Sequence, residues 1–177
     1  MKNGFTILEV IVATAVFSIA VSAISALFVV AVKTQRNVLA QQDLIDNTRY
    51  ALEHISRQIR MARRDETGSC VGQSSYTFTA SAPNTLTFID YRGECLTYDV
   101  TGGRINIIIN GGAPVDLTSD DILVNSLYFE VNGEWAYDVR QPRVTIYLDA
   151  EAAGATPESS PQILLQTTVS TRNIDTP

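Results

Sequence analysis

Histidine and cysteine are scarce in this sequence of 177 residues, which contains only His54, Cys70 and Cys95. These three residues fall short of the four ligands of a structural zinc site. The single histidine lies in a segment with helical spacing, so the rest of the chain lacks a Ser-His-Asp set. Phosphate-binding glycine loops, His-Glu-x-x-His and the nucleophile elbow are missing as well. We therefore expect no enzymatic activity, no cofactor, no bound metal and no small-molecule substrate.

Basic residues are also in the minority, with 13 Lys and Arg against 19 Asp and Glu and a net charge of −6. This balance argues against a nucleic-acid binder with a basic surface. The charges are unevenly distributed, because residues 1–32 are neutral overall, residues 33–64 carry +4 and residues 65–177 carry −10. Three successive segments of different charge are not typical of a single compact globule.

Charged side chains are absent from Val10 to Val32, a run of 23 residues. A helix of this length extends about 35 Å and can cross a hydrocarbon core of about 30 Å. A buried helix of a soluble protein rarely lacks a polar face for so long, and the apolar core of a secretory signal is shorter. Glycine and proline are absent from Phe5 to Glu66. We therefore expect one continuous helix whose first half spans a membrane.

Glu9 interrupts the apolar character of this region. A carboxylate at the head of a membrane span is costly unless it lies among solvated headgroups or meets a cation. Lys2 is seven residues away in sequence, so no base of this chain is placed to pair with it. Two explanations remain: solvation in the headgroup layer, or a cationic partner on another subunit.

The residues around this glutamate, Gly4-Phe5-Thr6-Ile7-Leu8-Glu9-Val10, resemble the prepilin motif of type IV pilins and of the pseudopilins of type II secretion. The resemblance implies that prepilin peptidase removes the leader, residues 1–4, by cleaving between Gly4 and Phe5 on the cytoplasmic side. It also implies N-methylation of Phe5. In the family, the carboxylate at the position of Glu9 pairs with the N-terminal amine of a neighbouring subunit. Residues 5–32 are then a transmembrane and assembly helix.

Residues 33–66 keep helical spacing and are predicted to form an amphipathic stem that continues this helix to about Arg64, with Gly68 as a stop signal. The expected apolar face consists of Val38, Ile45, Leu52, Ile55, Ile59 and Ala62. Another face carries Arg57, Arg60 and Arg64. These arginines are either solvated cations that are favourable near a helix C-terminus, or contacts to an acidic neighbouring subunit.

Residues 67–177 form the predicted head, in which apolar residues alternate with polar ones and turn residues separate the runs. We expect a mostly antiparallel β-sheet laid against the stem, which is an α+β fold. An exposed loop is expected over residues 151–161. Cys70 and Cys95 either form a disulfide, which we favour, or remain two free thiols. The acids Asp116, Asp120 and Asp121 match no calcium loop and are expected to be solvated.

Patterns in the head extend the family resemblance to the J-type minor pseudopilins and the W-type minor pilins. They are Leu127-Tyr128-Phe129, Gly133-Glu134-Trp135, Pro142-Arg143-Val144-Thr145-Ile146 and Thr168-Val169-Ser170-Thr171-Arg172-Asn173. Many major pilins have Gly and Pro inside the first helix, whereas this chain has Ser18 and Ala26 at the matching positions. The resemblance therefore implies a minor subunit rather than the main fibre subunit.

The implied protein crosses the cytoplasmic (inner) membrane once, with its head extracytoplasmic, and then joins a pilus or pseudopilus in a priming or tip complex. Its partners would be prepilin peptidase, the other minor subunits, the major subunit and the membrane, with no nucleic acid. A pilus, a secretion system and a competence system remain open. The alternatives are a tip adhesin, a DNA-uptake receptor and a plain single-pass anchored binding domain.

Overall fold

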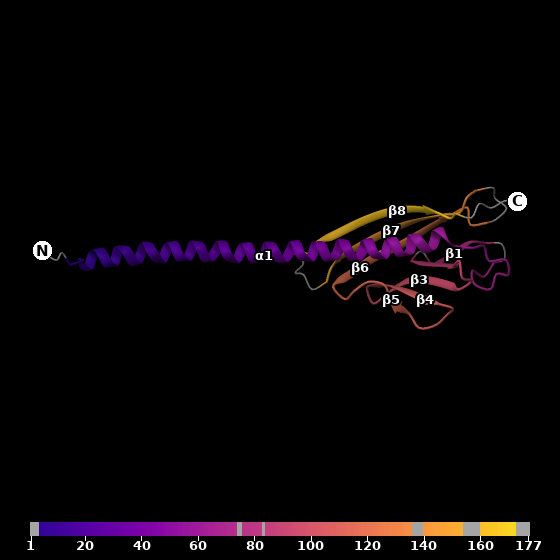
Figure 1. The fold of residues 1–177 in the computed structure, drawn as a ribbon, viewed down its shortest axis with the longest axis horizontal. Helices are drawn as coiled ribbons and strands as arrows, with labels where there is room; N and C mark the ends of the chain where they lie inside the picture. Colours follow the sequence, from indigo (N-terminus) through magenta and orange to yellow (C-terminus); the bar gives the residue numbers. More distant parts are fainter. Residues whose placement is uncertain (1–3, 74–75, 83, 136–139, 154–159, 173–177) are drawn as a thin grey trace. The chain divides into compact units, whose positions relative to one another are not determined.

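The computed structural model describes residues 4–73, 76–82, 84–135, 140–153 and 160–172 (Figure 1). Its elements are α1 Ile7–Arg60, β1 Phe78–Ala82, β2 Thr85–Ile89, β3 Cys95–Thr101, β4 Arg104–Ile109, β5 Val115–Asp116, β6 Ile122–Asn132, β7 Arg143–Ala152 and β8 Gln162–Ser170. The predicted α+β class, with one long N-terminal helix and antiparallel sheets, is confirmed. The chain divides into two compact units, Met1–Leu39 and Ala40–Pro177, and α1 contributes to both.

The first unit consists of the N-terminal part of α1. Its large apolar side chains are exposed, for example Ile7 at 82%, Phe17 at 69% and Leu27 at 71%. The hydroxyls of Ser18 and Ser22 donate to carbonyls four residues earlier, both at 2.8 Å, so they need no water. By length and composition, α1 is one helix that could cross a membrane, and its apolar segment is not buried within the protein.

The helix ends at Arg60, earlier than the predicted end at Arg64, and Gly68 lies beyond its end. The reason is long-range pairing of the chain that follows. The N–H of Arg63 donates to the carbonyl of Ile89 at 2.8 Å, and the N–H of Asp65 donates to that of Tyr76 at 2.9 Å. These bonds replace those of the next helical turn, since an amide that donates to a distant carbonyl does not also donate to the carbonyl four residues before it.

The buried face of α1 also differs from the predicted one. Leu44, Thr48, Ala51, Ile55 and Ile59 are its buried residues. Ile55 and Ile59 were predicted, and Ala62 is buried just after the helix, but Val38 is exposed while Ile45 and Leu52 are half-buried. A search for apolar residues alone does not find Thr48. Its hydroxyl donates to the carbonyl of Leu44 at 2.7 Å, so its hydrogen-bonding group is satisfied inside the core.

The strands form two antiparallel sheets, one ordered β1-β2-β3-β4-β5 and the other β6-β7-β8. The expected meander is thus found in the first sheet, whereas the second sheet was not foreseen as separate. Backbone hydrogen bonds connect the two sheets. The N–H of Thr77 donates to the carbonyl of Glu134 at 2.9 Å, and the N–H of Val124 donates to the carbonyl of Gly103 at 2.8 Å. The predicted loop over 151–161 begins later, since β7 continues to Ala152; residues 154–159 lie outside the described residues.

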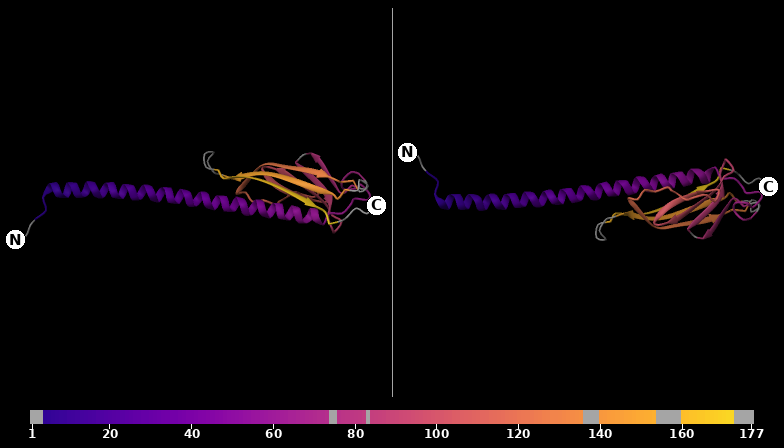
Figure 2. Two further views of the ribbon diagram at one scale, coloured as in Figure 1. Left: turned by 90° about the horizontal axis from the view of Figure 1, so that it is seen from above. Right: turned by 90° about the horizontal axis from the view of Figure 1, so that it is seen from below.

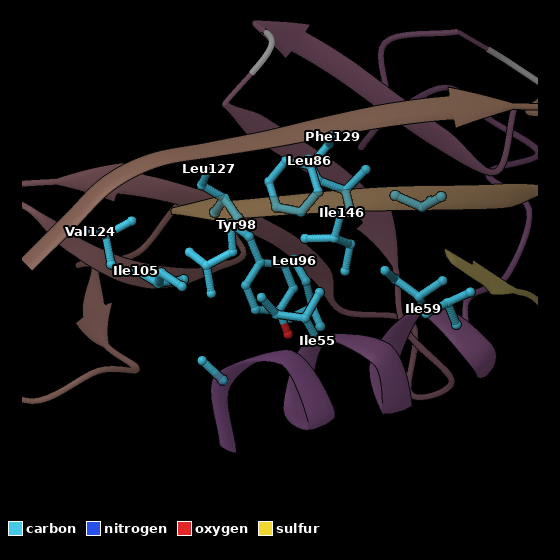
Figure 3. Close-up of a cluster of buried hydrophobic side chains, with 14 of the residues drawn as sticks. Ile55, Ile59, Leu86, Leu96, Tyr98, Ile105, Val124, Leu127, Phe129 and Ile146 are labelled. Atoms are coloured by element: carbon cyan, nitrogen blue, oxygen red, sulfur yellow. The ribbon is translucent and has the colours of Figure 1, made fainter. Parts of the chain in front are cut away.

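The core of the second unit joins both sheets to the C-terminal part of α1. In both views of Figure 2 the strands follow one side of this part of the helix. Figure 3 shows Ile55 and Ile59 pointing toward side chains of the strands, among them Tyr98 and Ile146. Tyr98 stacks on Phe88 with ring centroids 6.0 Å apart. This packing decides which face of the amphipathic helix is buried.

Cys70 and Cys95 form the predicted disulfide, with their Cα atoms 5.5 Å apart. The bond connects the segment after α1 to the start of β3. Closing a loop of this length stabilises a fold by about 3 kcal/mol in the chain-entropy model.

Candidate functional site

The N-terminal end of α1 carries a capping box made by Thr6 and Glu9. The N–H of Glu9 donates to the hydroxyl of Thr6 at 3.3 Å, and the N–H of Thr6 donates to the carboxylate of Glu9 at 3.4 Å. This reciprocal arrangement satisfies two amides that a helix start leaves unpaired, and it explains why the helix begins at Ile7. The Thr-x-x-Glu pattern could have been recognised in the sequence, but it was not part of the prediction.

Gly4 and Phe5 precede the helix. A Cβ added to Gly4 would meet no atom within 4 Å, so packing within the chain does not require glycine there. Phe5 is exposed to 83%. Packing among the described residues therefore does not explain why these two residues stand here.

The carboxylate of Glu9 is exposed, and among the described residues it forms no ion pair. Lys2 and most of the leader, residues 1–3, lie outside the described residues. Within the described ranges, the Glu9 carboxylate thus lies at the head of an apolar helix and accepts a hydrogen bond from the Thr6 amide alone. Its charge remains available to a cation from elsewhere.

The three arginines predicted on one helix face are not all on the helix. Arg57 lies 3.3 Å from Glu53 in an ion pair between exposed side chains, and Arg60 is the last helical residue. Arg64 falls after the end of α1, and its guanidinium is 3.8 Å from the carboxylate of Glu66. The predicted set is therefore divided.

Two other arginines join Arg57 and Arg60. The N–H of Arg172, after the end of β8, donates to the carbonyl of Arg60 at 2.9 Å. A hollow of about 410 Å³ is lined by Arg57, Arg60, Arg172, Glu53, Ser56 and Met61. A second hollow of about 300 Å³ shares Arg60, Met61 and Arg172 with it and adds Ala62, Arg63 and Tyr91. We call Arg57, Arg60, Arg63 and Arg172 the arginine groove. No local pattern could have revealed Arg172, because it comes from the far end of the chain.

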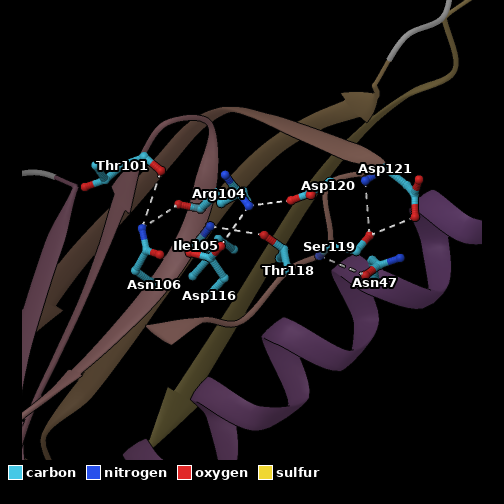
Figure 4. A network of polar contacts seen from close by, with 10 residues as sticks. All are labelled: Asn47, Thr101, Arg104, Ile105, Asn106, Asp116, Thr118, Ser119, Asp120 and Asp121. Carbon is cyan, nitrogen blue, oxygen red and sulfur yellow. Dashed lines mark hydrogen bonds and ion pairs between the residues drawn. The ribbon is translucent and has the colours of Figure 1, made fainter. Parts of the chain in front are cut away.

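The acids Asp116, Asp120 and Asp121, which match no calcium loop, are exposed as expected and also contact other side chains of the protein (Figure 4). Arg104 pairs with Asp116 at 2.8 Å and also with Asp120. The hydroxyl of Ser119 accepts the N–H of Asp121 at 3.3 Å. In the part of the chain that the structure describes, no three His, Cys, Asp or Glu side chains are grouped as metal ligands.

His54 lies on α1 at the margin of the core. Its Nδ1 and the hydroxyl of Tyr98 form a hydrogen bond of 3.4 Å. Partial burial lowers the pKa of His54, with a further contribution from the charge of Arg57. Burial is also the main cause that raises the pKa of Tyr98. These two residues connect the helix to β3, which is a packing role.

Asp65 is a buried carboxylate in the segment after the helix. Its oxygens accept the N–H groups of Gly68, Cys70 and Val71 at 2.7–3.0 Å, and a bond from the Thr67 hydroxyl. Burial acts to raise the pKa of Asp65, but these hydrogen bonds outweigh it and lower the pKa to about 2. Asp65 thus remains ionised and holds this turn, in which Cys70 forms its disulfide.

Comparison with known proteins gives a match at the N-terminus. Residues 1–25 match the family model described as the prokaryotic N-terminal methylation motif. No curated protein and no solved structure matches the chain. The match covers the capping box and most of the apolar run, and none of the head. A methylation motif at the start of a long apolar helix, followed by antiparallel sheets, supports a type IV pilin-like protein.

Proposed function

We propose that this chain is a non-catalytic minor subunit of a type IV pilus or of a type II secretion pseudopilus. The observation that carries the proposal is the motif itself: Glu9, which forms no ion pair with any described residue, lies at the head of an apolar helix whose side chains are exposed. Such a helix gains stability when it is surrounded by apolar helices or lipid. Proteins with this motif are processed by prepilin peptidase and assemble with other pilins in membrane filaments, which is a structural role.

Cleavage between Gly4 and Phe5 is the first step of the proposed function. Both residues lie before the first helical residue, and Phe5 is exposed, so a peptidase can reach the bond. Cleavage there leaves α1 intact and creates a new amine on Phe5, which would then be methylated. The leader is lost without any change to the core of the second unit.

Pairing of Glu9 with the Phe5 amine of a neighbouring subunit is the second step. The carboxylate keeps its bond from the Thr6 amide and still has oxygen lone pairs for an ammonium group. Among packed apolar helices, a carboxylate out of register would remain unpaired at a high cost in free energy. The pair would therefore select one axial register between subunits.

The location follows from the same features. We propose a single pass through the cytoplasmic membrane, with the head outside the cytoplasm, and then incorporation into the filament. The Cys70–Cys95 disulfide favours an oxidising compartment for the head. The unbroken α1 favours a minor subunit in a priming or tip complex, in contact with other minor subunits and the major one. Resemblance to J-type pseudopilins and W-type pilins rests on the head patterns alone.

The test is the intact mass of the chain, expressed with and without a prepilin peptidase. We expect loss of Met1–Gly4 and gain of one methyl group only when the peptidase is present. Gly4→Leu is the matched variant, because a side chain at this position meets no atom and should leave the fold unchanged. It should stay uncut. An unprocessed wild-type chain, or a processed Gly4→Leu variant, would contradict the proposal.

A further inference from the structure

We propose that the arginine groove of Arg57, Arg60, Arg63 and Arg172 binds carboxylate side chains of a neighbouring filament subunit. The inference rests on the proposed function, since it supposes that the chain has such neighbours. It concerns a surface that the N-terminal motif does not include.

The groove is built by backbone bonds between distant parts of the second unit. The amide of Arg172 is held 2.9 Å from the carbonyl of Arg60, and the amide of Arg63 is held 2.8 Å from that of Ile89. These bonds bring arginines from the end of α1, the segment after it and the end of β8 to one place. The two hollows that they line share Arg60, Met61 and Arg172 and therefore lie next to one another.

The positive charge of the groove is only partly compensated. Glu53 pairs with Arg57, but no carboxylate among the described residues forms an ion pair with Arg60, Arg63 or Arg172. A cation at the C-terminus of a helix is favourable by itself, which accounts for Arg57 and Arg60. It does not account for Arg63 and Arg172, which lie outside the helix. Their convergence on the same groove indicates a ligand of negative charge.

Carboxylates fit this groove for two reasons. Residues 40–177 contain arginine but no lysine, and the planar guanidinium matches a carboxylate in two parallel hydrogen bonds. The lining also includes Met61 and Tyr91. The guanidinium of Arg92 lies over the ring of Tyr91, 5.1 Å from its centroid. An apolar wall beside guanidinium groups suits the aliphatic stem of Glu or Asp.

A neighbouring subunit is the favoured source of these carboxylates. Residues 65–177 of this chain hold 15 acids and 5 bases, so a second copy of this chain offers an acidic head to the groove. Lipid phosphates are the other anions near such a protein. However, 24 residues separate Val32, the end of the apolar run, from Arg57, which argues for a protein ligand.

The experiment uses the full chain in nanodiscs of phosphatidylcholine, which carries no net charge. The probe is a fluorescent hexaglutamate peptide, with hexaglutamine as its uncharged match, and binding is followed by fluorescence anisotropy in physiological salt. We expect saturable binding of hexaglutamate only. The double variant Arg60→Gln, Arg172→Gln should weaken this binding by about tenfold or more, because it removes two of the four guanidinium groups that can form charge-assisted hydrogen bonds with the peptide.

Arg49→Gln is the control, because it removes one exposed arginine from the same helix outside the groove. It should change the affinity less than about twofold, as bulk charge effects are screened by salt. Absence of hexaglutamate binding, or an equal loss in Arg49→Gln, would overturn the proposal. Stronger binding to phosphatidylglycerol vesicles, lost in the double variant, would assign the groove to a membrane instead. Thermal unfolding of each variant checks that the fold is retained, and none of these results depends on processing at Gly4.

Discussion

Thr6 and Glu9 hold each other at the start of α1, with the amide of each donating to the side chain of the other at 3.4 and 3.3 Å. The glutamate therefore has two separable properties. Its oxygen atoms cap the helix, and its negative charge is available to a cation. Glutamine keeps the first property and loses the second, since it also serves in capping boxes.

Glu9→Gln should be processed normally but recovered with sheared filaments at a level reduced by about tenfold or more. An amine buried without its partner costs about 3–5 kcal/mol, whereas the cap itself is retained. Thr6→Ala is the control, since it removes about 1 kcal/mol of capping and keeps the charge. Normal assembly of Glu9→Gln would remove the proposed ion pair, and equal defects in both variants would assign the role to the cap.

Asp65→Asn should lower the free energy of unfolding by about 2–3 kcal/mol at neutral pH, because a carboxylate with several amide donors is replaced by a neutral group. Urea denaturation followed by circular dichroism measures this. Glu66→Gln, in an exposed ion pair with Arg64, should cost less than about 1 kcal/mol. Equal effects of the two changes would contradict the role assigned to Asp65.

The pH dependence of the same residue follows from its lowered pKa. The pKa of Asp65 is about 2 in the folded protein and has its ordinary value of 3.8 in the unfolded chain. The ionised carboxylate therefore stabilises the fold fully at a pH above the unfolded pKa. This stabilisation is lost as the pH falls through the folded pKa. The difference between wild type and Asp65→Asn should therefore shrink between about pH 4 and pH 2. A difference that stays constant over this range would exclude the ionised carboxylate as its cause.

Gly133→Ala should destabilise the protein more than Gly102→Ala. Both glycines have positive φ, 70° and 64°, but a Cβ at Gly133 would lie 3.0 Å from the carbonyl oxygen of Gln141, whereas one at Gly102 would meet no atom within 4 Å. We expect about 1 kcal/mol for Gly102→Ala from the left-handed backbone alone and about 2–3 kcal/mol for Gly133→Ala. Thermal unfolding measures both, and a reversed order would contradict the described turn at Gly133.

Replacement of Cys70 and Cys95 by serine should lower the free energy of unfolding by about 3 kcal/mol and keep the helical circular dichroism signal. The loss arises because the unfolded chain is no longer cross-linked. Reduction of the wild-type protein should have the same effect within error, and reduction of the double variant should have none. A wild-type protein insensitive to reductant would show that the bond contributes little.

The sequence was most informative where the physical cause is local. The apolar helix, its continuity and the place of Glu9 follow from neighbouring residues, because an apolar run of this length without Gly or Pro is too long for a strand and favours a helix. The disulfide could only be favoured, since the distance between two cysteines is a property of the folded chain. The strands were largely recognised from alternation, but their division into two sheets was not, since alternation says nothing about partners.

Residue order alone therefore determined the anchor, the prepilin-like motif and the α+β class, each of which depends on spacing along the chain. Tertiary contacts determined that α1 ends at Arg60, because Ile89 and Tyr76 capture the amides that follow. They also selected Thr48 for the core and brought Arg172 beside Arg60. Such choices depend on hydrogen bonds between residues far apart in sequence, for which a local pattern contains no signal.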